Sequence, residues 1–290
     1  MTDKFSDNGM VSAEDLYYLL GANRNIRVLD ASYSVAGGMQ SPYDAFLGKR
    51  IPEAQFFDID AIADREAALP HTAPNADFFA SCVSSLGVSN SDHIVIYDQS
   101  GAYMASSRAW WMFRLFGHEN VYVLEGGLEA WATGGFRTIS GAPESAAPGR
   151  FEAKLRSDLI VSRTDLMNNL ETGAITVIDA RPAGRFDGLL PEPRPGMRAG
   201  HIPGSVSLPF GNLMDMDTRH LLDEETLQAA FNAMEIGEDA KIAVSCGSGV
   251  TACTVALALF KARRQDAAVY DGSWSEWGHE SSGTPIELSA

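Results

Sequence analysis

The sequence has little cysteine, few basic residues and no long hydrophobic run. Only three cysteines occur among 290 residues, and their spacing matches no metal-ligand motif. We therefore expect neither a disulfide framework nor a zinc site, and no metal or organic cofactor. The sequence has 22 basic and 38 acidic residues, which give a formal net charge of −16. This charge argues against nucleic acid or an anionic membrane as a partner.

Membrane and export signals are also missing from the sequence. No apolar stretch approaches the length of a membrane-spanning helix, and the first residues, "MTDKFSDNGMVSAEDL", resemble neither a signal peptide nor a transit peptide. Together with the scarcity of cysteine, this favours a reducing compartment. We expect a cytoplasmic protein.

The chain contains an internal repeat. "VSAEDLYYLLGANRNIRVLDAS" at residues 11–32 is echoed by "VSRTDLMNNLETGAITVIDAR" at 161–181, and three further pairs of similar segments follow in the same order. Repetition on this scale indicates a duplicated domain. We predict a first domain at residues 1–137, a linker rich in Gly, Ala, Pro and Ser at 138–158, and a second domain at 159–290.

Each copy has the pattern of an α/β fold. Short β-branched runs ("IRVLD" and "HIVIY", then "ITVID" and "KIAVS") alternate with longer amphipathic segments, which predicts a parallel sheet flanked by crossover helices. Ser12 and Ser162 stand where helix N-caps are expected, each with an aspartate three residues later. The fold class is therefore α/β, in two similar domains.

The stretch "SCGSGVTACT" carries the strongest chemical signal. Cys246 follows the apolar run "KIAVS", and glycines lead from it into a helical pattern. Ligands of open α/β sheets bind beyond the carboxyl ends of the strands, and the partial positive charge at a helix N-terminus favours a thiolate over a thiol. We predict that Cys246 is a nucleophile in an amide-lined loop whose other members are Gly247, Ser248, Gly249, Val250 and Thr251.

The other two cysteines lie within helical patterns that lack such a loop. A cysteine in that setting is usually a small buried hydrophobic residue, and we interpret Cys82 in this way. Cys253 receives the same interpretation, although it lies seven residues after Cys246 and is close enough in the chain to line the same pocket.

The loop "CGSGVTAC", the tandem repeat, "GHIPG" at residues 200–204 and "DGSWSEWG" at 271–278 resemble the rhodanese superfamily, and more narrowly the two-domain 3-mercaptopyruvate sulfurtransferases. The resemblance implies tandem rhodanese-like domains, a persulfide intermediate on Cys246 and a non-catalytic N-terminal copy. Alignment of the two copies places Asp98 opposite Cys246. A carboxylate cannot accept a sulfane sulfur, which agrees with an inactive first copy.

The loop also bears on the sulfur donor. Thiosulfate-using rhodaneses typically carry basic residues directly after the cysteine, whereas Gly247 and Ser248 are neutral. The resemblance therefore implies 3-mercaptopyruvate as donor and pyruvate as product, with a thiosulfate:cyanide sulfurtransferase as the nearest alternative. Related phosphatases need a longer loop that ends in arginine. The sixth residue after Cys246 is Ala252, so the loop argues against phosphatase activity.

Two arginines match the family's substrate-binding positions. "GRF" and "PEPR" assign that role to Arg185 and Arg194, and the planar guanidinium group can bind a carboxylate through two parallel hydrogen bonds. The alternative is that these arginines are solvated or belong to structural ion pairs. Arg181 and Arg198 do not fall on matched positions, and we interpret them as structural.

The resemblance further implies a proton relay from "FFDIDAIADREAALPH", in which Asp60 and His71 act with Ser248. The alternative for His71 is a surface loop histidine. The sulfur acceptor is expected to be cyanide, thioredoxin or another thiol. An alternative of a different class is a non-enzymatic persulfide carrier or partner-binding module, which would have no need of Arg185 and Arg194.

Overall fold

The computed structural model describes residues 5–22, 25–34, 41–99, 101–215, 217–237, 240–264 and 266–289. Contacts between Cα atoms divide the chain into two units. The first consists of residues 1–65, 73–156 and 217–220, and the second of residues 66–72, 157–216 and 221–290. The sequence repeat predicts two domains in the same order, and the short segments 66–72 and 217–220 are grouped with the other copy.

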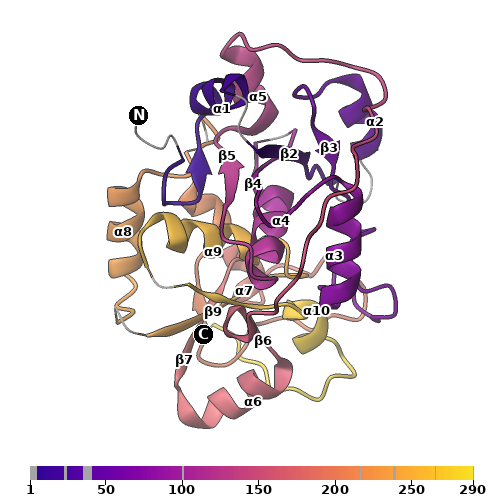
Figure 1. The fold of residues 1–290 in the computed structure, drawn as a ribbon. Coiled ribbons are helices and arrows are strands. Elements are labelled where there is room, and N and C mark those ends of the chain that lie inside the picture. The colour runs from indigo at the N-terminus through magenta and orange to yellow at the C-terminus, as the bar shows by residue number, and fades with distance from the viewer. Residues whose placement is uncertain are drawn as a thin grey trace. The chain divides into compact units, whose positions relative to one another are not determined.

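The first unit is built on a parallel five-stranded sheet in the order β1-β5-β4-β2-β3 (Figure 1). Its strands are β1 (Met10–Val11), β2 (Ile26–Asp30), β3 (Gln55–Phe56), β4 (His93–Tyr97) and β5 (Val121–Leu124). The connecting helices are α1 (Ala13–Gly21), α2 (Pro42–Gly48), α3 (Ala76–Ser85), α4 (Met104–Leu115) and α5 (Gly127–Thr133).

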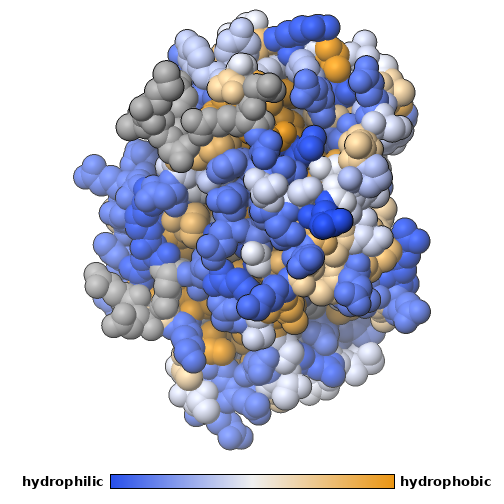
Figure 2. All heavy atoms as spheres, in the orientation of Figure 1, coloured by the Kyte–Doolittle hydropathy of each residue, from blue (hydrophilic) through white to orange (hydrophobic). Residues whose placement is uncertain are grey.

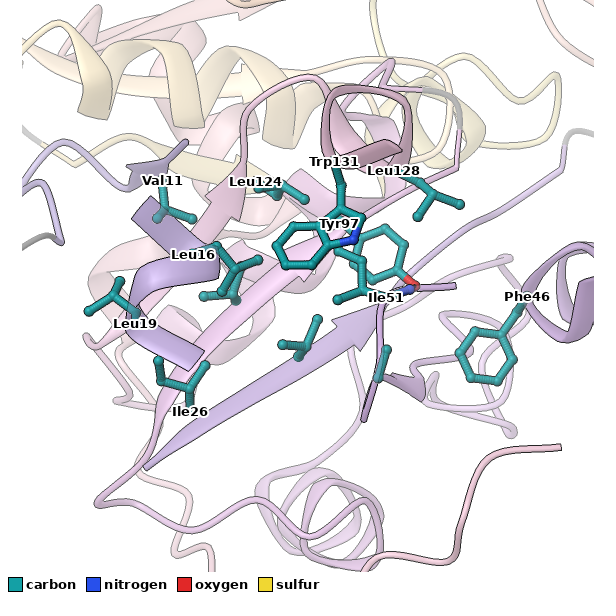
Figure 3. Packing of buried hydrophobic residues seen from close by; sticks show 13 residues of the cluster. Val11, Leu16, Leu19, Ile26, Phe46, Ile51, Tyr97, Leu124, Leu128 and Trp131 are labelled. Carbon is teal, nitrogen blue, oxygen red and sulfur yellow. The ribbon is translucent and has the colours of Figure 1, made fainter. Parts of the chain in front are cut away.

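Alternation along the strands gives this sheet two buried faces. Val28, Val95 and Tyr97 belong to a buried cluster that also contains Leu16 and Leu19 of α1 and residues of α2 and α5. Figure 3 shows Tyr97 in this cluster, together with the two leucines of α1. The chain neighbours of these strand residues, Leu29, Ile94 and Ile96, are equally buried and belong to the opposite face. A parallel sheet covered on both faces explains why these strands are apolar throughout.

The second unit repeats this topology, with a parallel sheet in the order β6-β10-β9-β7-β8. Its strands are β6 (Ile160–Val161), β7 (Ile175–Asp179), β8 (Val206–Ser207), β9 (Lys241–Ser245) and β10 (Ala268–Tyr270). The helices are α6 (Arg163–Thr172), α7 (Ala183–Phe186), α8 (Glu224–Asn232), α9 (Ala252–Lys261) and α10 (Ser273–Trp277), with short 3₁₀ turns at η1 (Ser157–Leu159) and η2 (Phe210–Leu213).

Strand register confirms the alignment of the two copies. Strands β2 and β4 pair from Ile26 with His93 to Asp30 with Tyr97, and β7 and β9 pair from Ile175 with Lys241 to Asp179 with Ser245. The residue after the central strand is therefore Asp98 in the first unit and Cys246 in the second. The structure places these two residues at equivalent positions of two equivalent sheets.

The helix starts follow the predicted capping chemistry. The Ser12 side chain accepts a hydrogen bond from the Asp15 amide, and Ser162 forms a complete capping box with Asp165. The hydrogen bonds that Ser162 donates lower the pKa of Asp165, since they favour the ionised carboxylate.

The segment predicted as a linker, residues 138–158, is largely hydrogen-bonded to the first unit. Arg50 and Ile139 exchange backbone hydrogen bonds, the Gly149 amide donates to the Ser84 carbonyl (2.8 Å), and the Lys154 amide donates to the Phe116 carbonyl (3.0 Å). The predicted domain limits at 137 and 159 remain a prediction, because these hydrogen bonds tie the segment to one unit without defining where a domain ends.

Hydrophilic residues make up most of the face shown in Figure 2, with hydrophobic residues between them. Among the helices of the described part of the chain, none is long and apolar enough to cross a membrane.

Candidate active site

Cys246 lies at the carboxyl end of β9, the central strand of the second unit, and is 1% exposed. Its backbone is fixed by the turn that follows β10. The Cys246 amide donates to Ser273 Oγ (3.1 Å), and the Trp274 amide donates to the Cys246 carbonyl (2.9 Å). Ser273 Oγ in turn donates to the Tyr270 carbonyl (2.7 Å), so two adjacent strand ends hold the cysteine.

The loop from Gly247 to Thr251 connects this cysteine to α9. The Gly247 carbonyl accepts hydrogen bonds from the Ser275 amide (2.9 Å) and hydroxyl (2.6 Å). Gly249 has φ of +75°, in the left-handed region that glycine adopts without steric cost. Among the residues that the structure describes, no acceptor takes the amides of Gly247, Ser248 or Val250, so these donors are available to an anion.

The remaining thiols have different surroundings. Cys253 is fully buried in the first turn of α9, and its Sγ donates to the Gly249 carbonyl (3.3 Å), which ties the helix to the loop. Cys82 lies in α3, where burial raises the pKa of its thiol while Arg65 opposes this. A raised pKa lowers the thiolate fraction, which agrees with a packing role for Cys82.

Two arginines converge on the loop. A methyl group built on Gly247 would lie 3.4 Å from Arg185 Nη2 and 3.6 Å from Arg194 Nη1. Arg185 belongs to α7 and its side chain is 20% exposed; Arg194 follows in the next loop, and its Nη1 lies 3.5 Å from Ser275 Oγ. Both guanidinium groups are thus next to the residue that follows Cys246.

A buried chain of charges supports Arg185. Asp179 at the end of β7 pairs with Arg181 (2.7 Å), and Arg181 pairs with Glu192 (2.7 Å). Arg185 donates two hydrogen bonds to Glu192. Its Nε donates to Oε1 (3.1 Å), and its Nη2 donates to Oε2. Desolvation of Arg181 favours its neutral form, but Asp179 and Glu192 outweigh that effect and raise its pKa above the ordinary value.

Arg181 and Arg198 have the structural surroundings that were predicted for them. Arg181 is buried and lies over the Trp274 ring, 4.2 Å from its centroid. Arg198 donates to the carbonyls of Gly278, Thr284 and Trp277 at 3.3, 2.8 and 2.9 Å. Since Trp274 also donates to the Cys246 carbonyl, Arg181 contributes to the site through packing.

Of the three residues of the predicted relay, Asp60 belongs to the first unit, and His71 and Ser248 belong to the second. Asp60 is exposed in a turn of the first unit, with its amide donating to Asp58 Oδ1 (2.9 Å). His71 is 9% exposed, has φ of +61°, and lies in segment 66–72, which is grouped with the second unit, as is Ser248. His71 is therefore not a surface histidine, and the relay itself stays a prediction.

The equivalent position of the first unit has different chemistry. Asp98 is buried and accepts a hydrogen bond from Ser106 Oγ (2.8 Å). The next residue, Gln99, is equivalent to Gly247, and its side chain donates to Asp30 Oδ2 and to the Lys49 carbonyl, both at 2.9 Å. Asp30 is equivalent to Asp179, but Ser32 stands where Arg181 would pair with it. Burial raises the pKa of Asp30.

Sequence reasoning missed Glu192 and Ser273. Glu192 stands between two prolines in "PEPR", and a charged residue in a proline-rich loop ordinarily indicates solvent exposure, yet its side chain is 4% exposed. Ser273 lies in the quoted "DGSWSEWG", but the sequence does not show that its hydroxyl accepts from the Cys246 amide.

Two parallel sheets of equal topology, with a cysteine and a glycine-containing loop after the central strand of the second, define a tandem α/β protein with one thiol site. A model of the Rhodanese-like domain matches residues 12–133 and 162–280. The chain belongs to the rhodanese family.

Individual relatives cover most of the chain. The 3-mercaptopyruvate sulfurtransferase of Mus musculus is 41% identical over 273 residues, which is 92% of this chain and 91% of the relative. A "thiosulfate/3-mercaptopyruvate sulfurtransferase 1, mitochondrial" of Arabidopsis thaliana is 39% identical over 91% of this chain and 74% of the relative. The crystal structure of SseA from Escherichia coli, described with the fold and catalytic mechanism of 3-mercaptopyruvate sulfotransferases, superposes with a TM-score of 0.82 at 35% identity and covers 92% of this chain and 99% of SseA.

Proposed function

We propose that the protein transfers the sulfur of 3-mercaptopyruvate to a thiophilic acceptor through a persulfide on Cys246 and releases pyruvate. The observation that carries this proposal is the convergence of Arg185 Nη2 and Arg194 Nη1 on Gly247, the residue that follows the buried Cys246. A small anionic donor bound by these arginines would have its sulfur next to Cys246. The names of the mouse and bacterial relatives agree with this substrate.

Arg185 and Arg194 bind the donor's carboxylate and keto oxygen. Glu192 occupies Nε and one Nη2 hydrogen of Arg185, so the edge between Nη1 and Nη2 retains donors for a two-point interaction. Fixing the donor at both ends of its keto acid aligns the C–S bond with the attacking thiolate.

The first chemical step forms one S–S bond and breaks one C–S bond. The Cys246 thiolate attacks the donor sulfur, and the electron pair of the C–S bond leaves with carbon as the enolate of pyruvate. The available amides of Gly247, Ser248 and Val250 stabilise negative charge on sulfur in the loop. A proton then reaches the enolate carbon, and the persulfide remains on Cys246.

Asp60, His71 and Ser248 supply that proton. The Ser248 hydroxyl is the member of this relay that belongs to the loop itself. Gly249, Val250 and Thr251 hold the persulfide with the remaining loop groups.

In the second step, cyanide, thioredoxin or another thiol takes the outer sulfur. The electron pair of the S–S bond returns to Cys246 as the thiolate. We place this reaction in the cytoplasm, where reduced thiols are abundant; some relatives, such as the Arabidopsis one, are named as mitochondrial.

Thiosulfate is the second candidate donor, because the Arabidopsis relative is named for both donors. It would transfer sulfur to the same thiolate and leave as sulfite. A persulfide carrier that receives sulfur from a protein is a weaker candidate, since two arginines beside the loop serve no purpose in it.

The test is pyruvate and sulfide release from 3-mercaptopyruvate, with thiosulfate in parallel and dithiothreitol as acceptor. We expect a higher kcat/KM for 3-mercaptopyruvate, and no turnover by Cys246→Ser with an unchanged melting temperature. Cys253→Ser is the matched control and retains activity. Substantial pyruvate formation by Cys246→Ser would contradict the assignment of Cys246 as the nucleophile. A higher kcat/KM for thiosulfate would contradict the assignment of 3-mercaptopyruvate as the donor.

A further inference from the structure

Glu192 is a buried carboxylate that the reaction does not use directly. Its side chain is 4% exposed and contacts two arginines, Arg181 and Arg185, of which Arg185 borders the thiol loop. We propose that Glu192 is a positioning and specificity-determining residue, which makes the site select a donor with one negative charge over a donor with two. This inference rests on the proposed function, because it concerns how the same site chooses its donor.

The charges around Glu192 balance. Asp179 and Glu192 are the two anions, Arg181 and Arg185 are the two cations, and the ion pairs join them in the order Asp179, Arg181, Glu192 and Arg185. Each cation therefore has a carboxylate partner. These four paired side chains together contribute no net charge to the loop, although they hold Arg185 in place as a hydrogen-bond donor.

Arg194 differs from Arg181 and Arg185 in its surroundings. No carboxylate in the described part of the chain forms an ion pair with it, and its contact is with Ser275 Oγ at 3.5 Å. The half-buried Arg194 therefore supplies one uncompensated positive charge beside Gly247. The loop residues from Gly247 to Thr251 carry no charged side chain.

One net positive charge suits a monoanion better than a dianion. The carboxylate of 3-mercaptopyruvate carries one negative charge, whereas thiosulfate carries two. A partly buried dianion with only one uncompensated cation leaves a desolvated negative charge without a partner, and such a charge is costly. Glu192 strengthens this selection because it is bound to the Arg185 guanidinium group. Its negative charge therefore repels a donor bound to the other edge of that group, and repels a dianion more than a monoanion.

Glu192 also fixes the orientation of the Arg185 side chain. It contacts Nε and Nη2 of Arg185, which fixes the plane of the guanidinium group. A neutral side chain of the same shape would retain part of this contact and remove only the charge. Position and charge can therefore be separated by substitution.

The experiment compares Glu192→Gln with wild type, with both donors and dithiothreitol as acceptor. Glu192→Gln adds one net positive charge to the site, so we expect the ratio of kcat/KM for thiosulfate to kcat/KM for 3-mercaptopyruvate to rise by about tenfold or more. Glu171→Gln, an exposed position in α6, makes the same change in total charge and should leave the ratio unchanged. Glu192→Asp retains the charge and should retain the wild-type ratio, even where both rates fall.

A binding measurement gives a readout that needs no turnover. Sulfate is an unreactive dianion, and we expect it to inhibit the 3-mercaptopyruvate reaction of Glu192→Gln at about tenfold lower concentration than that of wild type. The same lower concentration should protect Cys246 of Glu192→Gln from alkylation by iodoacetamide, an assay that works without any donor. Melting curves of all variants establish that they are folded.

The outcomes separate this inference from the proposed function. Equal losses with both donors in Glu192→Gln, with no change in sulfate affinity, would reduce Glu192 to a structural residue and overturn the inference. A change of donor ratio in Glu192→Asp equal to that in Glu192→Gln would also overturn it, because the charge is then irrelevant. Failure of wild type to use 3-mercaptopyruvate would overturn the proposed function, while the sulfate measurement would still test the role of Glu192.

Discussion

Arg194 and Arg198 lie four residues apart and have opposite surroundings. Arg194 Nη1 points to Gly247, whereas Arg198 donates to backbone carbonyls of the segment from Trp277 to Thr284. The first is placed to bind a donor and the second to hold a loop. The same substitution at each position should therefore have different consequences.

We expect Arg194→Lys to raise KM for 3-mercaptopyruvate about 10- to 100-fold with an unchanged melting temperature. Lysine keeps the charge but loses the planar fork, and a hydrogen bond to a charged group contributes about 1.5–3 kcal/mol. Arg198→Lys should lower the melting temperature and leave KM nearly unchanged. Steady-state kinetics and thermal denaturation of both variants provide the check; a melting shift without a KM effect in Arg194→Lys would remove it from the binding site.

Single residues also show where prediction from sequence succeeds. Ser12 and Ser162 were predictable as N-caps because capping depends on residues within one helical turn, and both cap as expected. Glu192 was not predictable, because its partner Arg181 is set by the course of a whole loop. Local chemistry is encoded in adjacent residues, whereas burial of a charge depends on the tertiary structure.

Among the structural elements, the loop between β9 and α9 is the one that shapes the site. Gly249 has φ of +75° in this loop, and its carbonyl accepts the Cys253 thiol. An alanine there must adopt a conformation that costs about 1–2 kcal/mol in L-residues. It would relieve the strain by shifting the loop amides away from the thiol.

We therefore expect Gly249→Ala to lower both stability and kcat. Gly173 provides the matched control, since it has φ of +60° at the C-cap of α6 and an added Cβ would meet no atom of the described residues within 4 Å. Gly173→Ala should have a similar folding cost but unchanged kcat per folded molecule. Denaturant unfolding and kcat of both variants decide the point, and equal kcat in both would show that the loop tolerates the shift.

The order of elements was largely predictable. The β-branched runs correspond to β2, β4, β7 and β9, because strands buried on both faces keep a continuous apolar signature. The two-residue strands β1, β3, β6 and β8 gave no such signal. Strands this short depend on pairing with a neighbour and carry too few residues for a periodic pattern.

On the scale of the whole molecule, a duplicated fold has kept one thiol site. The strand registers make Asp98 equivalent to Cys246 and Gln99 equivalent to Gly247. The Gln99 side chain crosses to Asp30 and Lys49, whereas Gly247 leaves room for two guanidinium groups. The first unit thus lacks more than a nucleophile.

We expect that the double variant Asp98→Cys, Cys246→Ser forms no pyruvate from 3-mercaptopyruvate. Beside a thiol placed at residue 98 stands Gln99, whose side chain is bound to Asp30 and Lys49, whereas the residue beside Cys246 is Gly247 with Arg185 and Arg194 next to it. Pyruvate assays of the double variant against Cys246→Ser alone test this. Recovery of turnover would mean that the thiol position by itself is sufficient.

The repeat predicted two similar units, but it did not predict that segments 66–72 and 217–220 group with the opposite unit. Periodicity reports on local structure, and the packing of irregular segments depends on contacts that no repeat encodes. The placement of His71 is the example that concerns the site.

The central claim is that Cys246 carries the transferred sulfur, and its most direct test is the intact mass of the protein after incubation with 3-mercaptopyruvate in the absence of an acceptor. Our account predicts a gain of one sulfur atom, mapped by peptide analysis to Cys246 and removed by cyanide as thiocyanate. Cys253→Ser should gain the sulfur as wild type does. A gain that persists in Cys246→Ser, or maps to Cys253, would contradict the account.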